Sequence, residues 1–190
     1  MSAEKIKQAA LQLFAAHGYD GTSLAQIATA VGIKKQSIYT HFQGKDQLFL
    51  ALIRETFEIE RKREEAFFSE QEQLSLKHFL ENVLASYLVR FDHDDRLKFW
   101  LRNTFLPPKH LYPVINKQVN QYILDIETIY LPRFEQAVLE GEISRIDASQ
   151  VNLAFSALLD SIEVELIYGD QERVKEKMNA SWSIFWNGIC

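Results

Sequence analysis

The sequence predicts an all-α protein, and its length leaves room for one large domain or for a small domain attached to a larger one. Apolar residues recur at intervals of three and four along most of the chain, as one face of an α-helix requires. No segment shows the strict alternation of apolar and polar residues that marks a half-buried strand. With 190 residues, 47% of them hydrophobic, the chain can bury such a core without disulfides, and Cys190 is its only cysteine.

The first two helices have recognisable ends. An apolar stripe predicts the first helix, and Gly18 is placed to end it near His17 in a left-handed cap. Ser23, followed by Gln26, matches a capping box that opens a second helix, and Gly32 stops that helix. A third helix is expected to begin one or two residues later. The stripe of the first helix consists of Ile6, Ala9, Ala10, Leu13 and Phe14.

The remaining helices are longer. A fourth is expected to start near Lys45, and charge pairs spaced four residues apart in "EIERKREEAFF" predict a solvated face for its later part. The segment "LPPKHLYP" at 106–113 must break a helix, because proline cannot donate its amide. Pro132 is expected to kink or interrupt a later helix. Periodicity predicts the later helices at about 74–91, 94–105, 111–140, 147–168 and 171–188.

Charge is distributed unevenly along the chain. The whole sequence carries a net charge of −5, but residues 1–47 carry +2 and the rest −7. A locally positive field suits a polyanionic partner such as nucleic acid. The charged start "MSAEKIKQAA" and the lack of about 18 consecutive apolar residues predict a cytoplasmic protein that is neither exported nor membrane-spanning.

No motif in the sequence predicts catalysis. The chain has no glycine-rich phosphate loop, no His-Glu-x-x-His and no nucleophile with an obvious base, so we expect neither an enzyme nor a bound cofactor. The run "DHDD" at 92–95 contains residue types that bind metals, but four consecutive residues cannot easily converge on one ion. A helix boundary with a cap is the better interpretation, and no metal site is expected.

The spacing of apolar and small residues from Leu24 onward is typical of a helix-turn-helix. Small residues stand where two helices cross closely and where the chain turns, and apolar residues fill the angle between the helices. The polar side chains after the turn then face outward. Lysine and glutamine suit base edges in the major groove, hydroxyl groups suit phosphates or base edges, and Lys45 suits a phosphate. The apolar positions are Ile27, Val31, Ile33 and Ile38, and the small ones are Ala28 and Gly32.

Residues 6–49 resemble the N-terminal domain of the TetR family of bacterial transcriptional repressors. The resemblance rests on "LF..HGYDGTSL..IA..VGI", "SIYTHF" and "KDQL". It implies a three-helix, helix-turn-helix DNA-binding domain at 1–46 and a larger helical effector-binding and dimerisation domain at 47–190. Lys34 and Gln36 are longer than the family's common residues there, which leaves the operator sequence open. The predicted DNA-binding residues are Ser23, Lys34, Lys35, Gln36, Ser37, Tyr39, Thr40, His41 and Lys45.

The same resemblance implies that the last two helices pair with those of a second copy in a four-helix bundle. Apolar stripes in both helices permit such a bundle. Two recognition helices related by a dyad would fit a palindromic operator, whereas one helix alone covers few base pairs. The predicted interface residues are Phe155, Leu158, Ile162, Met178, Trp182 and Phe185.

Some of the aromatic residues after residue 90 are expected to line a pocket for a small hydrophobic effector. The charge of the effector stays open. The acids of "FSALLDSIEVELIYG" would favour a cation, whereas Arg90, Arg96 and Arg102 would favour an anion. The candidate lining residues are Phe99, Trp100, Phe105, Tyr122, Phe134 and Glu163.

Two functions from different classes follow from these patterns. The first is a ligand-responsive transcriptional regulator, expected to be a repressor, that binds a palindromic operator as a homodimer and is released when an effector moves the fourth helix. The alternative is an interaction module whose helix-turn-helix no longer reads DNA. Intact Lys34, Lys35, Tyr39 and Lys45 favour the first function, because a degenerating reader should lose its phosphate contacts first.

Overall fold

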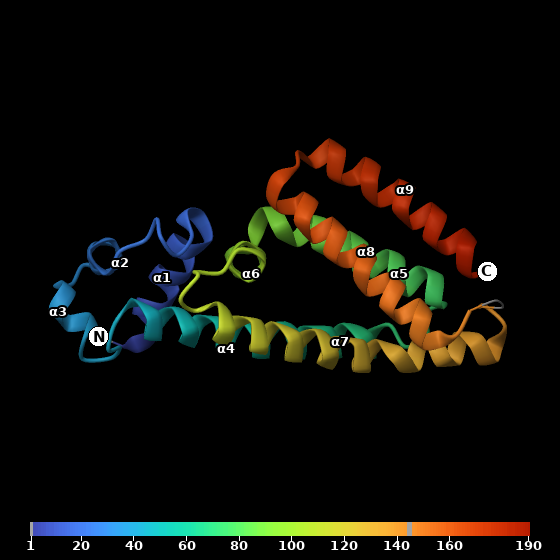
Figure 1. Cartoon of the computed structure of the whole chain (residues 1–190), viewed down its shortest axis with the longest axis horizontal. Coiled ribbons are helices and arrows are strands. Elements are labelled where there is room, and N and C mark those ends of the chain that lie inside the picture. Colours follow the sequence, from blue (N-terminus) through green and yellow to red (C-terminus); the bar gives the residue numbers. More distant parts are fainter. Residues whose placement is uncertain (1, 144–145) are drawn as a thin grey trace. The chain divides into compact units, whose positions relative to one another are not determined.

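The computed structural model describes residues 2–143 and 146–190, and within them the chain forms nine α-helices and no strand (Figure 1). The predicted all-α class is therefore confirmed. None of these helices combines the length and apolar composition needed to cross a bilayer. The helices are α1 (Ala3–His17), α2 (Leu24–Val31), α3 (Lys35–Ile38), α4 (Lys45–Glu70), α5 (Leu76–His93), α6 (Asp95–Phe105), α7 (Tyr112–Glu140), α8 (Ala148–Tyr168) and α9 (Gln171–Ile189).

The helix ends lie close to the positions that capping residues predict. The five helices after residue 74 begin and end within about two residues of expectation. Ser23 and Gln26 form the predicted capping box, and Asp94 caps α6 by accepting the backbone amides of Arg96 and Leu97 at 2.9 and 3.3 Å. Helix α7 continues through Pro132 over 29 residues, so Pro132 does not interrupt it, and a kink at this position stays a prediction. A proline removes one bond of the ladder, and here Tyr130 and Phe134 are buried on either side of it.

Glycines at the first two turns behave differently. Gly32 adopts the left-handed conformation (φ 75°, ψ 35°) and its amide donates to the end of α2. Gly18 has a positive φ of 69° but an extended ψ of −178°, so it is not the left-handed helical cap that was predicted. The chain leaves α1 at once, and the Tyr19 ring stacks parallel to that of Phe14 at 6.2 Å.

The helices pack into two compact units. Unit 1 comprises residues up to Glu60 together with His93–Asn120, and unit 2 comprises Arg61–Asp92 together with Gln121–Cys190. Helices α4 and α7 each begin in unit 1 and end in unit 2. Unit 1 is larger than the predicted DNA-binding domain, because α4 and α6 share a core with α1 and α2. The domain boundary after residue 46 stays a prediction.

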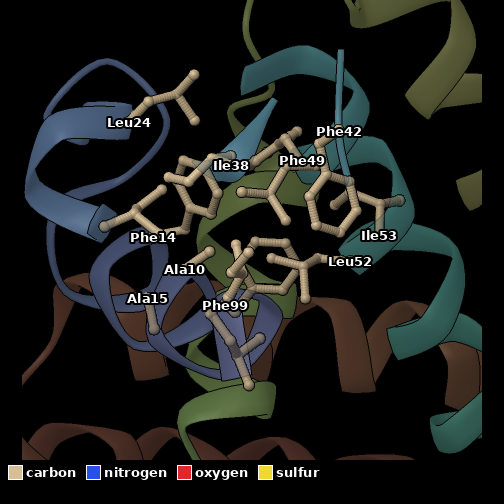
Figure 2. Close-up of a cluster of buried hydrophobic side chains, with 14 of the residues drawn as sticks. Ala10, Phe14, Ala15, Leu24, Ile38, Phe42, Phe49, Leu52, Ile53 and Phe99 are labelled. Carbon is tan, nitrogen blue, oxygen red and sulfur yellow. The ribbon is translucent and has the colours of Figure 1, made fainter. Parts of the chain in front are cut away.

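Three phenylalanines from three helices form the centre of unit 1 (Figure 2). Phe14 of α1, Phe49 of α4 and Phe99 of α6 have no exposed surface. The Phe49 ring meets those of Phe14 and Phe99 edge to face at 5.0 and 5.6 Å between centroids. Each buried side chain of this size contributes roughly 1.5–3 kcal/mol through its removal from water. The same cluster includes Ile38 and Phe42, which come from α3 and the turn after it.

Unit 2 has its own aromatic interior, and its α8 and α9 form an antiparallel hairpin (Figure 1). Phe79 of α5, Tyr130 and Phe134 of α7 and Phe155 of α8 are buried there. The Tyr130 ring lies 5.5 Å from that of Phe79 and 6.3 Å from that of Phe155. The α8–α9 connection is tight, since a Cβ atom on Gly169 would lie 2.8 Å from the Glu165 carbonyl oxygen.

Replacing Phe99 by alanine is expected to lower the free energy of unfolding by about 3–5 kcal/mol, because it leaves a cavity between α1, α4 and α6. Urea denaturation followed by far-UV circular dichroism measures this change. The matched control is Phe105→Ala, at the end of the same helix, whose side chain is half-exposed and should cost under about 1 kcal/mol. Equal losses for the two variants would contradict a core role for Phe99.

Candidate nucleic-acid interface

Helix α3 is short and is held in place by two buried side chains. Its regular hydrogen bonds end at Ile38, and a turn continues to Phe42, with the amides of His41 and Phe42 donating to the Ile38 carbonyl at 2.9 and 3.0 Å. Ile38 is fully buried and Phe42 nearly so. A four-residue helix is far too short to be stable alone, so this burial fixes its position.

All seven predicted DNA-contact residues of this segment face solvent. The 51% exposure of Tyr39 is notable for so large a side chain, because it gains nothing from the core. The Thr40 hydroxyl donates to the Ser37 carbonyl at 2.8 Å, which leaves its oxygen free to accept. Their exposure agrees with the sequence analysis, while their contact with DNA stays a prediction. The exposed residues are Lys34, Lys35, Gln36, Ser37, Tyr39, Thr40 and His41.

Ser23 has a structural role at the start of α2. Its hydroxyl donates to Gln26 Oε1 at 2.8 Å and accepts the Gln26 amide at 3.2 Å. Its own backbone amide donates to the same Gln26 oxygen at 2.8 Å. Ser23 is exposed, so a DNA contact is compatible with this capping box and stays a prediction.

Lys45 is directed into its own domain. Its ammonium group donates to the carbonyl oxygens of Tyr19 at 2.9 Å and Thr22 at 3.0 Å, and lies 3.8 Å from the centroid of the Tyr19 ring. These contacts tie the start of α4 to the turn between α1 and α2. An ammonium group has three hydrogens, so one remains for a phosphate. The predicted phosphate contact therefore stays a prediction, beside a structural role that the sequence did not indicate.

Tyr19, Asp46 and His110 form a polar cluster next to Lys45. The Tyr19 hydroxyl donates to Asp46, and His110 Nε2 lies 3.2 Å from Asp46 Oδ2. The bond from Tyr19 holds the pKa of Asp46 below its usual value, with a further contribution from His110. Burial and the neighbouring Asp46 carboxylate raise the pKa of Tyr19. Sequence reasoning missed this cluster, because His110 is 91 residues from Tyr19 and no local pattern connects them.

The six predicted ligand-lining residues are divided equally between the two units. Phe99 and Trp100 are buried in unit 1, where the Trp100 ring meets Phe57 edge to face at 4.3 Å, and Phe105 is half-exposed. The other three residues are in unit 2. Contact of each with a ligand stays a prediction. Those in unit 2 are Tyr122, Phe134 and Glu163.

Unit 2 contains a buried carboxylate that the sequence analysis missed. Glu64 is 5% exposed and accepts a hydrogen bond from the Tyr130 hydroxyl, so the predicted solvated face of "EIERKREEAFF" is wrong at this position. Burial raises the pKa of Tyr130 and of Tyr87, and the negative charges of Glu64 and Glu163 raise both further. A charged residue at the correct helical spacing can face inward when a buried hydroxyl supplies its partner.

The arginines proposed for an anionic ligand are divided in the same way. Arg96 lies 3.8 Å from Glu55 and 3.5 Å from the Thr56 hydroxyl, and Arg102 donates to the Ala16 carbonyl. All of these residues belong to unit 1. Two of the three arginines are thus engaged with α1 and α4.

Two of the predicted dimer-interface residues are core residues of unit 2. Phe155 and Ile162 have at most 1% of their surface exposed, and the Phe155 ring contacts Phe134 and Phe185 within α7 and α9. Both side chains are thus already buried within the single chain, and their contact with a second copy stays a prediction. Leu158, Met178, Trp182 and Phe185 are half-buried, and the Trp182 indole donates to Glu81 at 3.1 Å.

Replacing Lys45 by alanine is expected to lower the free energy of unfolding by about 1–3 kcal/mol, because two carbonyl oxygens lose a charged donor. Lys35→Ala is the control, since Lys35 is exposed and should change stability by less than about 0.5 kcal/mol. Chemical denaturation of both variants without DNA gives the comparison. Wild-type stability in Lys45→Ala would show that its intramolecular bonds contribute little.

Replacing Tyr19 by phenylalanine is expected to raise the pKa of Asp46 toward its usual value, because the carboxylate loses its principal donor. Asp46 stabilises the fold above its unfolded-state pKa of about 4, and this contribution is lost as pH falls through the lower folded-state pKa. Carbon-13 NMR titration of the carboxyl groups measures the pKa of Asp46 in the wild-type protein and in the variant. Asp147, whose pKa is lowered by Ser149, is the internal control. An unchanged Asp46 midpoint would contradict the assigned cause.

Comparison with known proteins identifies relatives of this chain. Residues 6–52 match the family model described as bacterial regulatory proteins, tetR family. The chain is 27% identical over 175 residues to the HTH-type transcriptional repressor AcnR of Corynebacterium glutamicum, covering 85% of this chain and 90% of AcnR. It is 28% identical over 132 residues to IcaR of Staphylococcus epidermidis, a negative regulator of the biofilm operon icaADBC, covering 66% of this chain and 63% of IcaR.

The fold as a whole is also shared. The transcriptional regulator FadR of Bacillus subtilis, solved in complex with stearoyl-CoA, superimposes with a TM-score of 0.74 at 17% identity over 100% of both chains. The curated relatives regulate transcription and are not enzymes. A helix-turn-helix with an exposed polar face, the family model that matches residues 6–52 and the similarity to AcnR and IcaR together support a TetR-family regulator.

Proposed function

We propose that this protein is a ligand-responsive transcriptional repressor that binds a palindromic operator as a homodimer. The observation that carries the proposal is the surface around α3, where Ile38 and Phe42 are buried while seven consecutive or nearly consecutive polar side chains face solvent. A segment built only to fold would not need to keep so many hydrogen-bonding groups exposed around its two buried anchors. The relatives AcnR and IcaR, described as repressors, support the direction of regulation.

The exposed residues have the chemistry that the major groove recognises. Lys35 can donate to guanine O6 and N7, and Gln36 can make two bonds with adenine. Tyr39 and Lys34 supply donors for phosphate oxygens, which orient the protein without reading sequence. The positive charge of the N-terminal segment favours approach to DNA despite the acidic remainder of the chain.

The homodimer is supported by an exposed apolar stripe on the hairpin of α8 and α9. Leu153, Ala157, Val164 and Tyr168 recur along α8 at helical spacing, and Ile184 of α9 is 76% exposed. By helical spacing, the four α8 residues lie on the face of that helix opposite to the buried Phe155 and Ile162. A second copy of the same hairpin would cover them and form the four-helix bundle that the family resemblance implies.

The effector is proposed to be a small molecule with an apolar body that binds in unit 2. The aromatic interior around Phe134 and Tyr130 supplies apolar walls, and Glu64 and Glu163 add acceptors for a donor group or a positive charge. FadR, which shares the fold, is solved with the long acyl chain of stearoyl-CoA. Because Arg96 and Arg102 bond within unit 1, they give less support to an anionic effector.

Operator binding is tested by fluorescence anisotropy on duplexes from the DNA flanking the protein's own gene, over a series of salt concentrations. Lys35→Ala is expected to weaken binding about tenfold and to lower the slope of log K against log salt by about one, as the loss of one ionic contact requires. Tyr39→Ala should weaken binding with a smaller change of slope. Lys5→Ala, an exposed lysine on α1, serves as the control.

Equal affinity for all duplexes, unchanged in Lys35→Ala and Tyr39→Ala, would contradict recognition of the neighbouring DNA. Selection from a random duplex pool then separates a distant operator from the alternative, a helix-turn-helix that binds a protein partner. When an operator is found, compounds that release it and also raise the melting temperature identify effectors, because a ligand stabilises the state to which it binds.

Replacing Ile184 by glutamate is expected to convert the dimer to a folded monomer and to reduce operator affinity at least tenfold, because a charge cannot be buried unpaired in the bundle. Sedimentation velocity reports the mass, and circular dichroism checks the fold. Val89→Glu is the matched control, since Val89 of α5 is similarly exposed, at 71%, and lies outside the stripe. A dimer that tolerates Ile184→Glu would place the interface elsewhere.

A further inference from the structure

Tyr19, Asp46 and His110 join three segments of unit 1 that are distant in sequence: the turn after α1, the first turn of α4 and the connection between α6 and α7. The Tyr19 hydroxyl donates to Asp46 and lies 3.4 Å from His110 Nε2, which is 3.2 Å from Asp46 Oδ2. The Tyr19 and His110 rings meet edge to face with centroids 5.4 Å apart. We call these three residues the Tyr19 clamp.

One side of the Tyr19 clamp is connected to the start of α2, which precedes the exposed polar face of α3, here called the reading surface. The Tyr19 ring packs edge to face on Phe49 at 5.0 Å, and Lys45 holds the carbonyl oxygens of Tyr19 and Thr22. Thr22 directly precedes the cap of α2, and its hydroxyl donates to the Leu13 carbonyl at 3.1 Å. The turn held by these contacts therefore sets the start of α2, which is followed by α3.

The other side of the clamp lies at the beginning of two helices that leave unit 1. Asp46 is the second residue of α4, and His110 stands two residues before α7. Both helices continue into unit 2, α4 beyond Glu60 and α7 beyond Asn120. A continuous helix transmits a displacement along its length, because its backbone hydrogen bonds fix each residue relative to the next. Both helices therefore connect this contact to unit 2 through continuous helical backbone.

We propose that Tyr19, Asp46 and His110 are positioning residues for DNA reading, whose contact holds the first turns of α4 and α7 in the register that presents α3 to the operator. The inference rests on the proposed function and adds the place at which effector-linked movement of α4 or α7 acts on the reading surface. The side chains of His110 and Asp46 are about half-exposed, at 54% and 51%. A contact this open to water is weak enough to be made and broken without unfolding.

A double-mutant cycle on operator affinity tests the coupling. Tyr19→Phe and His110→Phe each remove polar groups while keeping a ring in place, and both leave the charge of the clamp's carboxylate unchanged. Each single variant is expected to weaken operator binding about three- to fivefold. The double variant is expected to bind no more weakly than the weaker-binding single variant, because all three variants break the same contact. The salt slope should stay at the wild-type value, since no phosphate contact is removed. Tyr112→Phe, at an exposed residue in the first turn of α7, is the control.

Hydrogen exchange of the free protein provides a readout that needs no DNA. His110→Phe is expected to speed amide exchange in residues 24–38, more than 70 residues away in sequence, without changing the melting temperature. Unchanged exchange together with multiplicative effects on affinity would overturn the proposal. Failure of the wild-type protein to bind any operator would instead contradict the proposed function, and the exchange data alone would then decide whether the clamp positions α2 and α3.

Discussion

Burial of Ile38 in the core of unit 1 is the interaction on which the reading surface depends. Helix α3 has four residues and is too short to be stable alone, so its position depends on the core that buries Ile38 and Phe42. The same core contains Phe14 of α1, Phe49 of α4 and Phe99 of α6. The exposed polar residues are therefore positioned by a core to which they contribute nothing.

Charged side chains in unit 1 make contacts that hold its turns and helices together. Lys45 secures the turn between α1 and α2, and Asp46 connects that turn to His110. Such contacts lie at the edge of the phenylalanine cluster, where a polar group can satisfy carbonyl oxygens that the turn leaves without helical partners. The start of α4 is consequently fixed by electrostatic contacts on one face and by apolar packing of Leu48 and Phe49 on the other.

Local signals in the sequence were sufficient for the helices, for the capping box at Ser23 and for the exposed face of α3, but not for the conformation of Gly18. Periodicity and the pairs Ser23–Gln26 and Asp94–Leu97 act within one helical turn, so they can be recognised without the fold. The inward direction of Glu64 and the Tyr19–His110 contact depend on residues 66 and 91 positions away, which no local pattern encodes. The burial of Phe155 and Ile162 within their own chain was also not foreseeable, because an apolar stripe does not reveal whether its own chain or a second copy covers it.

The separation between anchoring and reading side chains has an evolutionary consequence. Lys34, Lys35, Gln36 and His41 can each be exchanged for another polar residue with little effect on folding, because none of them is buried and Ile38 supplies the attachment. Under the proposed function, single substitutions at these positions can change which operator is bound while the protein still folds. The same property makes the segment a suitable site for retargeting in the laboratory, with the core left untouched.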